Sequence, residues 1–332
     1  MTSAVPESGL NSSPNTSTND GWTRPGVILV ATDLTELDRL MPFAFQQASE
    51  TGARLVLLHV LAAGEGIAVD SIGMPYYDPS GASELAARTL EPWCAEARAY
   101  CVTCKAYVRE GNASQQILAA VKQFQADRIL LCTRSRGRLG KLLIGSVAEH
   151  ILRSVDIPVM TVGPEAYPPS ASESQSDPNR QIVLHATTLK ETSRRSAALA
   201  CQVAASQKAK LILLHVLPPM DEMERKGLPT GLDSAAIHEL RLLAAETGTG
   251  CCTTIEPRVV HGNPSIEILA EAAESRANQI VLGATMRSAF ENLTLERTIY
   301  RVLAHARCPV LTLRDPAPEP IEADTDRMIV NG

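Results

Sequence analysis

A repeated set of motifs constrains this chain more than any other feature of its sequence. Ile157-Pro-Val recurs as Cys308-Pro-Val, and Gly111-Asn-Ala-Ser recurs as Gly262-Asn-Pro-Ser. In both cases the second copy lies 151 residues after the first, from 157 to 308 and from 111 to 262. Two unrelated motifs at one spacing indicate a duplicated domain. The 332 residues are enough for two domains, each with its own hydrophobic core.

Segments without hydrophobic periodicity mark the predicted domain boundaries. Residues 1–22 are rich in Ser, Asn, Thr and Pro and are predicted to be a disordered tail. Residues 164–179 have the composition of a linker, and residues 315–332 that of a second tail. The two predicted domains are therefore residues 23–163 and 180–314.

Strands and helices alternate within each predicted domain. Short apolar strands separated by helices imply a parallel sheet covered on both faces. We therefore expect an α/β fold of two tandem doubly wound domains, each with a five-stranded parallel sheet. The predicted strands are Val27 to Thr32, Arg54 to Leu61, Cys101 to Val108, Arg128 to Cys132 and Val159 to Val162 in the first domain, and Ile182 to Ala186, Lys210 to Val216, Thr253 to Val260, Gln279 to Gly283 and Val310 to Leu313 in the second. The predicted helices of the first domain are Glu36 to Thr51, Ser83 to Ala99, Ala113 to Phe124 and Ser146 to Ser154.

Composition narrows the class of protein. A net charge of −6 argues against nucleic-acid binding, which needs a surplus of Lys and Arg on one face. The sequence contains no run of about 18 apolar residues, so we expect no contact with a membrane. The start lacks the pattern of a secretion signal, and we expect a cytoplasmic protein.

The eight cysteines fall mostly in predicted helices and strands, as expected for buried thiols in a reducing compartment. Cys101 and Cys104 form a CxxC pair inside the predicted strand Cys101 to Val108. Residues three apart in a strand point to opposite faces, and no second CxxC completes a zinc site. We expect structural cysteines and no metal site.

Asp33 ends the first predicted strand, at the edge where open α/β sheets bind ligands. A carboxylate there can accept hydrogen bonds from a sugar or a base. It can equally well cap the following helix, and the sequence leaves both roles open.

Gly145 and Ser146 open a predicted helix whose free amides can bind an anion. Ser146 and Glu149 also match a capping box, and the two roles are compatible. The preceding loop carries a cluster of basic residues that would favour a phosphate group, although such residues are also common on solvated loops. They are Arg134, Arg136, Arg138 and Lys141.

Together these motifs resemble the universal stress protein family over residues 26–163 and 180–314. The resemblance rests on Asp33 after the first strand, Leu57-Leu-His-Val60, Gly111-Asn-Ala, Ala126-Asp127, Gly145-Ser-Val147 and Ile157-Pro-Val. It implies a possible site for ATP, with magnesium, in the first domain. The implied site residues are Ala31, Thr32, Asp33, Val60, Cys132, Arg134, Ser135, Gly145, Ser146 and Val147.

The family's nucleotide-binding pattern GxxGx9G[ST] falls on Cys132, Ser135, Gly145 and Ser146, so its first two glycines are missing. Each replacement adds a β-carbon where the backbone would approach the ligand, and we expect weakened binding. The resemblance places Ala31, Thr32 and Asp33 at the base and ribose, Val60 at the adenine and Arg134 at the phosphates.

The second domain departs further from the pattern. The positions that correspond to the phosphate site are Gly283, Met286, Glu296 and Arg297, and Thr188 stands in the place of Asp33. A carboxylate at the phosphate position repels the ligand, so we expect a structural domain without nucleotide. The resemblance also implies that the two halves pair as a pseudo-dimer through their last strands. Formation of a homo-oligomer stays open.

Sequence motifs give little support for catalysis. The chain has no GxxxxGK[ST], HExxH or GxSxG motif. His59 and His215 occupy matching places, which favours a structural role over acid–base chemistry. We expect a stress-response factor with a degenerate adenine-nucleotide site and not an enzyme, with slow ATP hydrolysis or autophosphorylation left open. The alternative is a scaffold protein that binds no nucleotide and acts through dimerisation or partner binding.

Overall fold

The computed structural model describes residues 22, 24–62, 67–69, 71–133, 144–167, 181–221, 231–248, 254–284 and 293–314. Residues 1–21 and 315–332 of the predicted tails, and residues 168–179 of the predicted linker, lie outside the described residues.

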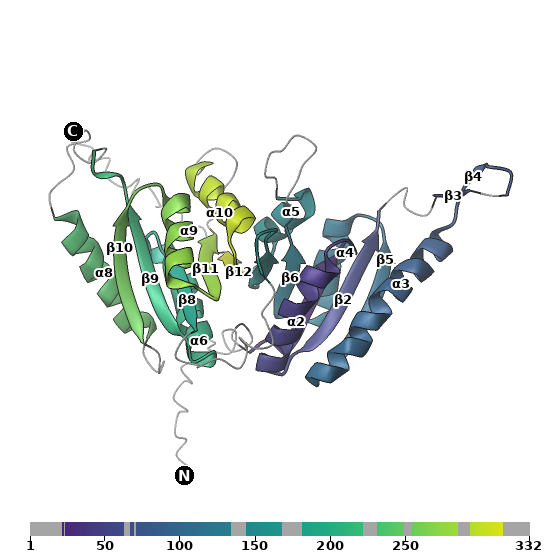
Figure 1. Cartoon of the computed structure of the whole chain (residues 1–332), viewed down its shortest axis with the longest axis horizontal. Helices are drawn as coiled ribbons and strands as arrows, with labels where there is room; N and C mark the ends of the chain where they lie inside the picture. The colour runs from purple at the N-terminus through teal and green to yellow at the C-terminus, as the bar shows by residue number, and fades with distance from the viewer. Residues whose placement is uncertain are drawn as a thin grey trace, which may run out of the picture.

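The strands form one ten-stranded sheet with the order β10-β9-β8-β11-β12-β7-β6-β1-β2-β5 (Figure 1). All neighbours within each half are parallel. The predicted α/β fold with two doubly wound halves is therefore confirmed. The strands are β1 (Val27–Thr32), β2 (Arg54–Leu61), β5 (Cys104–Glu110), β6 (Arg128–Cys132), β7 (Val159–Val162), β8 (Ile182–Ala186), β9 (Lys210–Leu217), β10 (Ile255–His261), β11 (Gln279–Ala284) and β12 (Val310–Arg314).

Helices cover both faces of the sheet because its strands are apolar on both sides. In β1, Ile28 and Val30 belong to the buried cluster that contains Leu40 of α2 and Leu90 of α3. Leu29 belongs to the cluster on the opposite face, formed with α4 and α5. The second half repeats this arrangement. The helices are α2 (Leu37–Thr51), α3 (Pro79–Glu96), α4 (Ala113–Phe124), α5 (Ser146–Ser154), α6 (Arg194–Ser206), α8 (Leu232–Thr247), α9 (Pro264–Ser275) and α10 (Leu293–His305).

The two halves join through β7 and β12, which pair antiparallel. Thr161 of β7 donates its hydroxyl to the carbonyl oxygen of Val310 at 3.2 Å, and Thr312 of β12 donates to Val159 at 3.0 Å. Both threonines are almost fully buried. This reciprocal contact confirms the predicted pairing of the last strands.

Residues 164–167, at the start of the predicted linker, pack against the second half. Ala166 is buried, and the N–H of Tyr167 donates to the carbonyl oxygen of Arg307 at 3.3 Å. Glu165 contacts the ring of His305 at 2.9 Å. The linker therefore begins as part of the junction between the halves.

The two halves also hold the start of their first strands in the same way. The carboxylate of Asp127 accepts hydrogen bonds from the N–H groups of Gly26 and Val27 at 2.8 and 3.0 Å. Asn278, 151 residues later, accepts one from the N–H of Ile182 at 2.9 Å. Each side chain ties the start of its own half to the strand paired beside it.

The predicted strand Cys101 to Val108 is wrong at its start, because β5 begins at Cys104. A 3-10 helix, η2 (Ala97–Tyr100), follows α3, and Cys101 ends it in the left-handed conformation with φ 58°. This turn keeps Cys101 exposed and out of the sheet. The argument that Cys101 and Cys104 point to opposite faces of one strand therefore fails.

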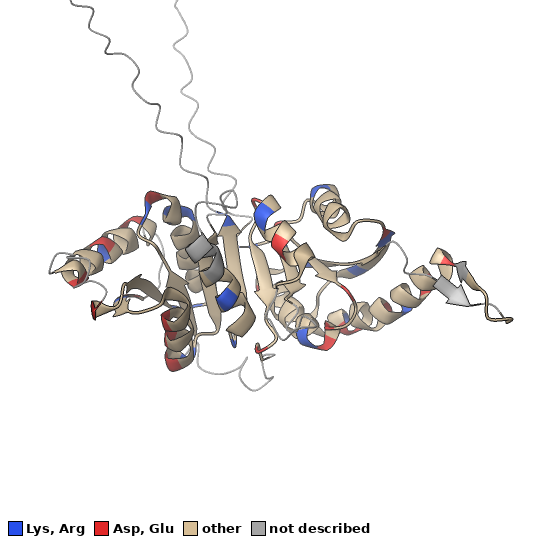
Figure 2. Ribbon diagram, turned by 90° about the horizontal axis from the view of Figure 1, so that it is seen from above, with Lys and Arg blue, Asp and Glu red and all other residues tan. Residues whose placement is uncertain are grey.

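A small antiparallel pair, β3 (Ile67–Val69) and β4 (Pro75–Tyr77), precedes α3 and was not predicted. Figure 1 shows it beyond the outer end of α3. Acidic and basic residues are interspersed along the outer helices (Figure 2). Within the described ranges, no helix combines the length and apolar character needed to cross a membrane.

Candidate functional site

Most of the predicted site residues lie at or just beyond the carboxyl ends of strands, at the point where the strand order reverses. In the order β5-β2-β1-β6-β7, the chain passes from β1 to β2 on one side, while β6 and β7 lie on the other. An open α/β sheet has its ligand crevice outside the carboxyl ends of the strands at such a point. Asp33 follows β1, Cys132 ends β6, and α5 begins after β6.

Asp33 lies in a tight turn between β1 and α2. Its Oδ1 accepts hydrogen bonds from the backbone N–H of Thr35 at 3.1 Å and from the Thr35 hydroxyl at 2.7 Å. The next residue, Leu34, has φ 71°, and α2 has Glu36 as its N-cap. Asp33 is therefore not the cap of α2, and that alternative is wrong.

His59 fixes the neighbouring strand end. Its Nδ1 lies 2.9 Å from the carbonyl oxygen of Thr32, and the ring is buried. His215 contacts the carbonyl oxygen of Thr187 at the same distance of 2.9 Å. Both histidines therefore make the same contact to the end of the neighbouring strand, as the predicted structural role requires. Val60, the next residue of β2, is partly exposed.

Cys132 occupies the first glycine position of the nucleotide-binding pattern and is partly exposed. Burial raises the pKa of its thiol to about 11, with Arg39 opposing this effect and Glu36 and Asp33 adding to it. The thiol is therefore neutral near pH 7. The interaction also places Asp33 and Arg39 within electrostatic reach of Cys132.

Arg39 was not among the predicted site residues. It forms an ion pair with Glu36 at 3.0 Å and donates to the carbonyl oxygen of Pro164 at 3.4 Å. The sequence carries a signal for it, since Glu36 and Arg39 have the spacing of a helical ion pair. This cation lies at the same sheet edge as the predicted phosphate site.

Among the described residues, nothing covers the amino end of α5 near its N-cap. The N-cap is Gly145, with φ −58° and ψ 145°, and a Cβ added there would meet no described residue within 4 Å. Ser146 is exposed in the first helical position, and Glu149 pairs with Arg153 at 3.1 Å. The capping box with Ser146 as its cap is therefore wrong. The amides of a first helical turn have no partner within the helix, and they can bind an anion.

Several predicted positions fall outside the described residues. These are Arg134 and Ser135 of the site, the basic residues Arg136, Arg138 and Lys141, and Met286 together with the side chains of Glu296 and Arg297 in the second half. Of the remaining second-half positions, Gly283 lies in β11, and the Thr188 hydroxyl contacts that of Ser193 at 2.9 Å. The second half thus has a hydroxyl where the first half has a carboxylate.

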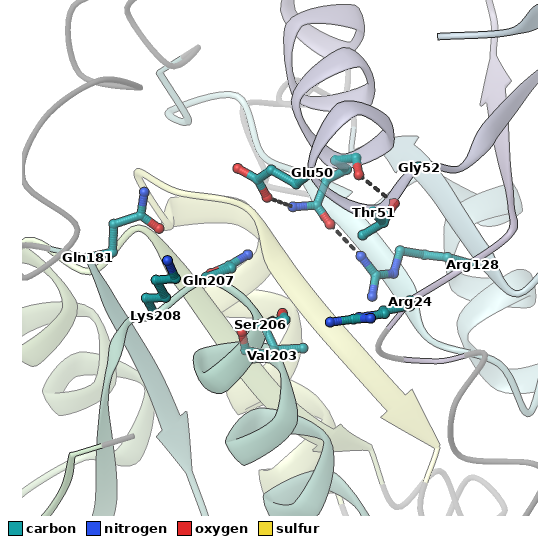
Figure 3. A pocket seen from close by; sticks show the side chains of 11 residues that line it. Arg24, Glu50, Thr51, Gly52, Arg128, Gln181, Val203, Ser206, Gln207 and Lys208 are labelled. Atoms are coloured by element: carbon teal, nitrogen blue, oxygen red, sulfur yellow. Dashed lines mark hydrogen bonds between the residues drawn. The ribbon is translucent and has the colours of Figure 1, made fainter. Parts of the chain in front are cut away.

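A polar cavity of about 480 Å³ lies between the two halves, on the side of the sheet where the parallel strands begin (Figure 3). Arg128, the first residue of β6, is only 2% exposed there. Its guanidinium donates to the carbonyl oxygen of Trp22 at 2.7 Å and to the side chain of Gln47. Burial lowers its pKa to about 10, and the nearby Glu50 partly offsets this effect. The cavity is separate from the predicted nucleotide site, and sequence reasoning did not find it.

The architecture is that of two open α/β domains that pair edge to edge within one chain. A solved universal stress protein from Archaeoglobus fulgidus has the same arrangement, with a TM-score of 0.67 at 19% identity over 90% of this chain and 99% of its own. The family model for the universal stress protein family matches residues 26–163 and 179–314. The chain therefore belongs to the universal stress protein family.

Other relatives extend the comparison. A universal stress protein from Mycolicibacterium smegmatis is 23% identical over 312 residues, which span 88% of this chain and 98% of the relative. A further solved member, in complex with cAMP, is 25% identical and covers 40% of this chain and 96% of its own, with a TM-score of 0.34.

Proposed function

We propose that this tandem universal stress protein is a stress-response factor that binds an adenine nucleotide in its first half, with the second half in a structural role. One observation carries the proposal: Asp33, Val60 and Cys132 lie at the carboxyl ends of neighbouring strands where the strand order reverses, and α5, with Gly145 as its N-cap, follows the last of these strands. A cytoplasmic location, the domain limits 23–163 and 180–314, and the absence of catalysis belong to the same proposal.

The residues present fit such a ligand in part. Asp33 and Val60 suit the ribose and the base, and the open amino end of α5 suits a phosphate group, with magnesium expected to accompany ATP. Cys132 stands where the family pattern has a glycine. Its side chain adds volume to the site but no charge, because the thiol is neutral near pH 7. We therefore expect weak binding.

Calorimetric titration with ATP and magnesium tests the proposal. The variant Gly145→Glu copies Glu296, the residue at the matching position of the second half, and so places a carboxylate at the phosphate position. A Cβ added at Gly145 meets none of the described residues within 4 Å, so the variant is expected to fold. Gly145→Gln is the matched control of equal bulk. We expect saturable binding by the parent protein, weakened at least about tenfold in Gly145→Glu but much less in Gly145→Gln.

A second pair of substitutions restores the missing glycines. Cys132→Gly with Ser135→Gly is expected to strengthen ATP binding, because it removes two β-carbons at the family's close-approach positions. If neither the parent nor this variant takes up nucleotide, the proposal is wrong. The alternative of a scaffold acting through partner binding or dimerisation would then stand.

A further inference from the structure

Two thiols at the outer edge of the first half lie in direct contact. Cys94 of α3 and Cys104 of β5 have their sulfur atoms 2.9 Å apart. The CxxC spacing in the sequence associates Cys104 with Cys101, whereas the fold places Cys104 against Cys94. Figure 1 shows α3 beside β5, at the end of the sheet away from the junction between the halves.

The turn between α3 and β5 holds this pair in place. The N–H of Val102 donates to the carbonyl oxygen of Ala97 at 3.0 Å, and both residues are buried. Tyr100 stacks on Phe45 of α2 with their ring centroids 4.9 Å apart. The chain therefore reverses at a fixed point, which brings the thiols together and leaves Cys101 outside, in solvent.

The two thiols are chemically unequal. The hydrogen bond between the two thiols lowers the pKa of Cys94; burial opposes this effect, and the positive charge of Arg98 adds to it. The same hydrogen bond, together with burial, raises the pKa of Cys104. Cys94 is therefore the thiol that more readily forms a thiolate, the reactive form of cysteine.

A small reagent can reach the pair. Both cysteines are partly exposed and line an open groove of about 580 Å³, together with Ala87 of α3 and Tyr107 of β5. Cys201 and Cys308, by contrast, are buried.

We propose that Cys94 and Cys104 form a redox-active dithiol that a hydroperoxide converts into a disulfide between α3 and β5. The Cys94 thiolate attacks the peroxide, the O–O bond breaks, and Cys94 becomes a sulfenic acid as hydroxide or alkoxide leaves. The sulfur of Cys104 then attacks the sulfenic sulfur. An S–S bond forms, the S–O bond breaks, and the departing hydroxide takes up the proton of Cys104 as water. The two sulfur atoms together lose the two electrons that reduce the peroxide, and a thiol reductant reverses the change.

Peptide mapping of the full chain after treatment with hydrogen peroxide tests this proposal. Trypsin separates Cys94, in Thr89–Arg98, from Cys101 and Cys104, which share Ala99–Lys105. We expect these two peptides to be joined after oxidation and to separate with dithiothreitol. The Cys101→Ser variant should keep the crosslink, and the Cys104→Ser variant should lose it.

Trapping with dimedone tests the order of attack. In Cys104→Ser the sulfenic acid has no resolving thiol, so we expect the dimedone adduct on Cys94. The proposal is overturned if the crosslink depends on Cys101, if the parent forms no crosslink, or if Cys94 proceeds to the sulfinic acid in the parent. An adduct on Cys101 in place of Cys94 would also overturn it.

Discussion

Replacement of Gly163 by alanine is predicted to loosen the junction between the two halves. Gly163 follows β7, and a Cβ added there would lie 2.6 Å from the carbonyl oxygen of Leu303 in α10 and 3.5 Å from that of Ala306. The first distance is shorter than any normal contact, and the atom it meets belongs to the backbone. The end of β7 and the last turn of α10 must therefore move apart, and we expect a loss of about 1–3 kcal/mol in the free energy of unfolding.

Equilibrium urea unfolding of the parent and of Gly163→Ala measures this loss. Gly26→Ala is a suitable control, because its added Cβ would meet Asp127 at an ordinary contact distance of 3.6 Å. The control should change stability by less than about 0.5 kcal/mol, as most substitutions away from special sites do. The reasoning from close approach would be refuted if Gly163→Ala were as stable as this control.

Three further predictions concern stability. Thr161→Val and Thr312→Val should each lower the free energy of unfolding by about 1 kcal/mol in urea, because each removes one buried hydrogen bond across the junction; unchanged stability of the double variant would contradict this. Asp127→Ala should cost about 1.5–3 kcal/mol through two lost hydrogen bonds at the start of β1, and Asp127→Asn, which keeps an acceptor, should cost less in the same assay. Burial lowers the pKa of His185 from 6.5 to about 4. At pH values between these two pKa values, the unfolded chain therefore binds a proton at His185 that the folded protein does not bind. Stability should therefore fall by roughly 3 kcal/mol from pH 7 to pH 4, and His185→Phe should lack this part of the pH dependence in unfolding curves.

Much of the fold could be predicted from the sequence because apolar runs and turn residues are local signals. The strand predicted at Arg128 to Cys132 and the helix predicted at Ala113 to Phe124 have the observed bounds. The turn at Cys101 was missed because Cys101 and the residues after it have strand-like composition. The hydrogen bonds back to η2, which end the helical segment there, depend on the packing of Ala97 and Val102.

The candidate site was predictable to the extent that it depends on strand order. Parallel strands present their carboxyl ends at one edge, so Asp33 could be assigned to the ligand edge without coordinates. Val60 and Cys132 were assigned to it through the resemblance to the family. The local roles of individual side chains were harder to predict from the sequence. Ser146 matched a capping pattern, yet the helix begins with Gly145 as its cap. Arg128 would be expected at the surface, and its hydrogen bonds to Trp22 and Gln47, residues distant in the sequence, become evident only in the fold.

The antiparallel pairing of β7 and β12 joins the two halves inside a single chain. The association is intramolecular, so dilution does not separate the partners, and each half always meets the same neighbour. Because the two halves are encoded separately, a substitution in one is not copied into the other, as it would be in a dimer of identical chains. Thr188 could therefore replace the carboxylate in one half while Asp33 persisted in the other, with the shared sheet unchanged.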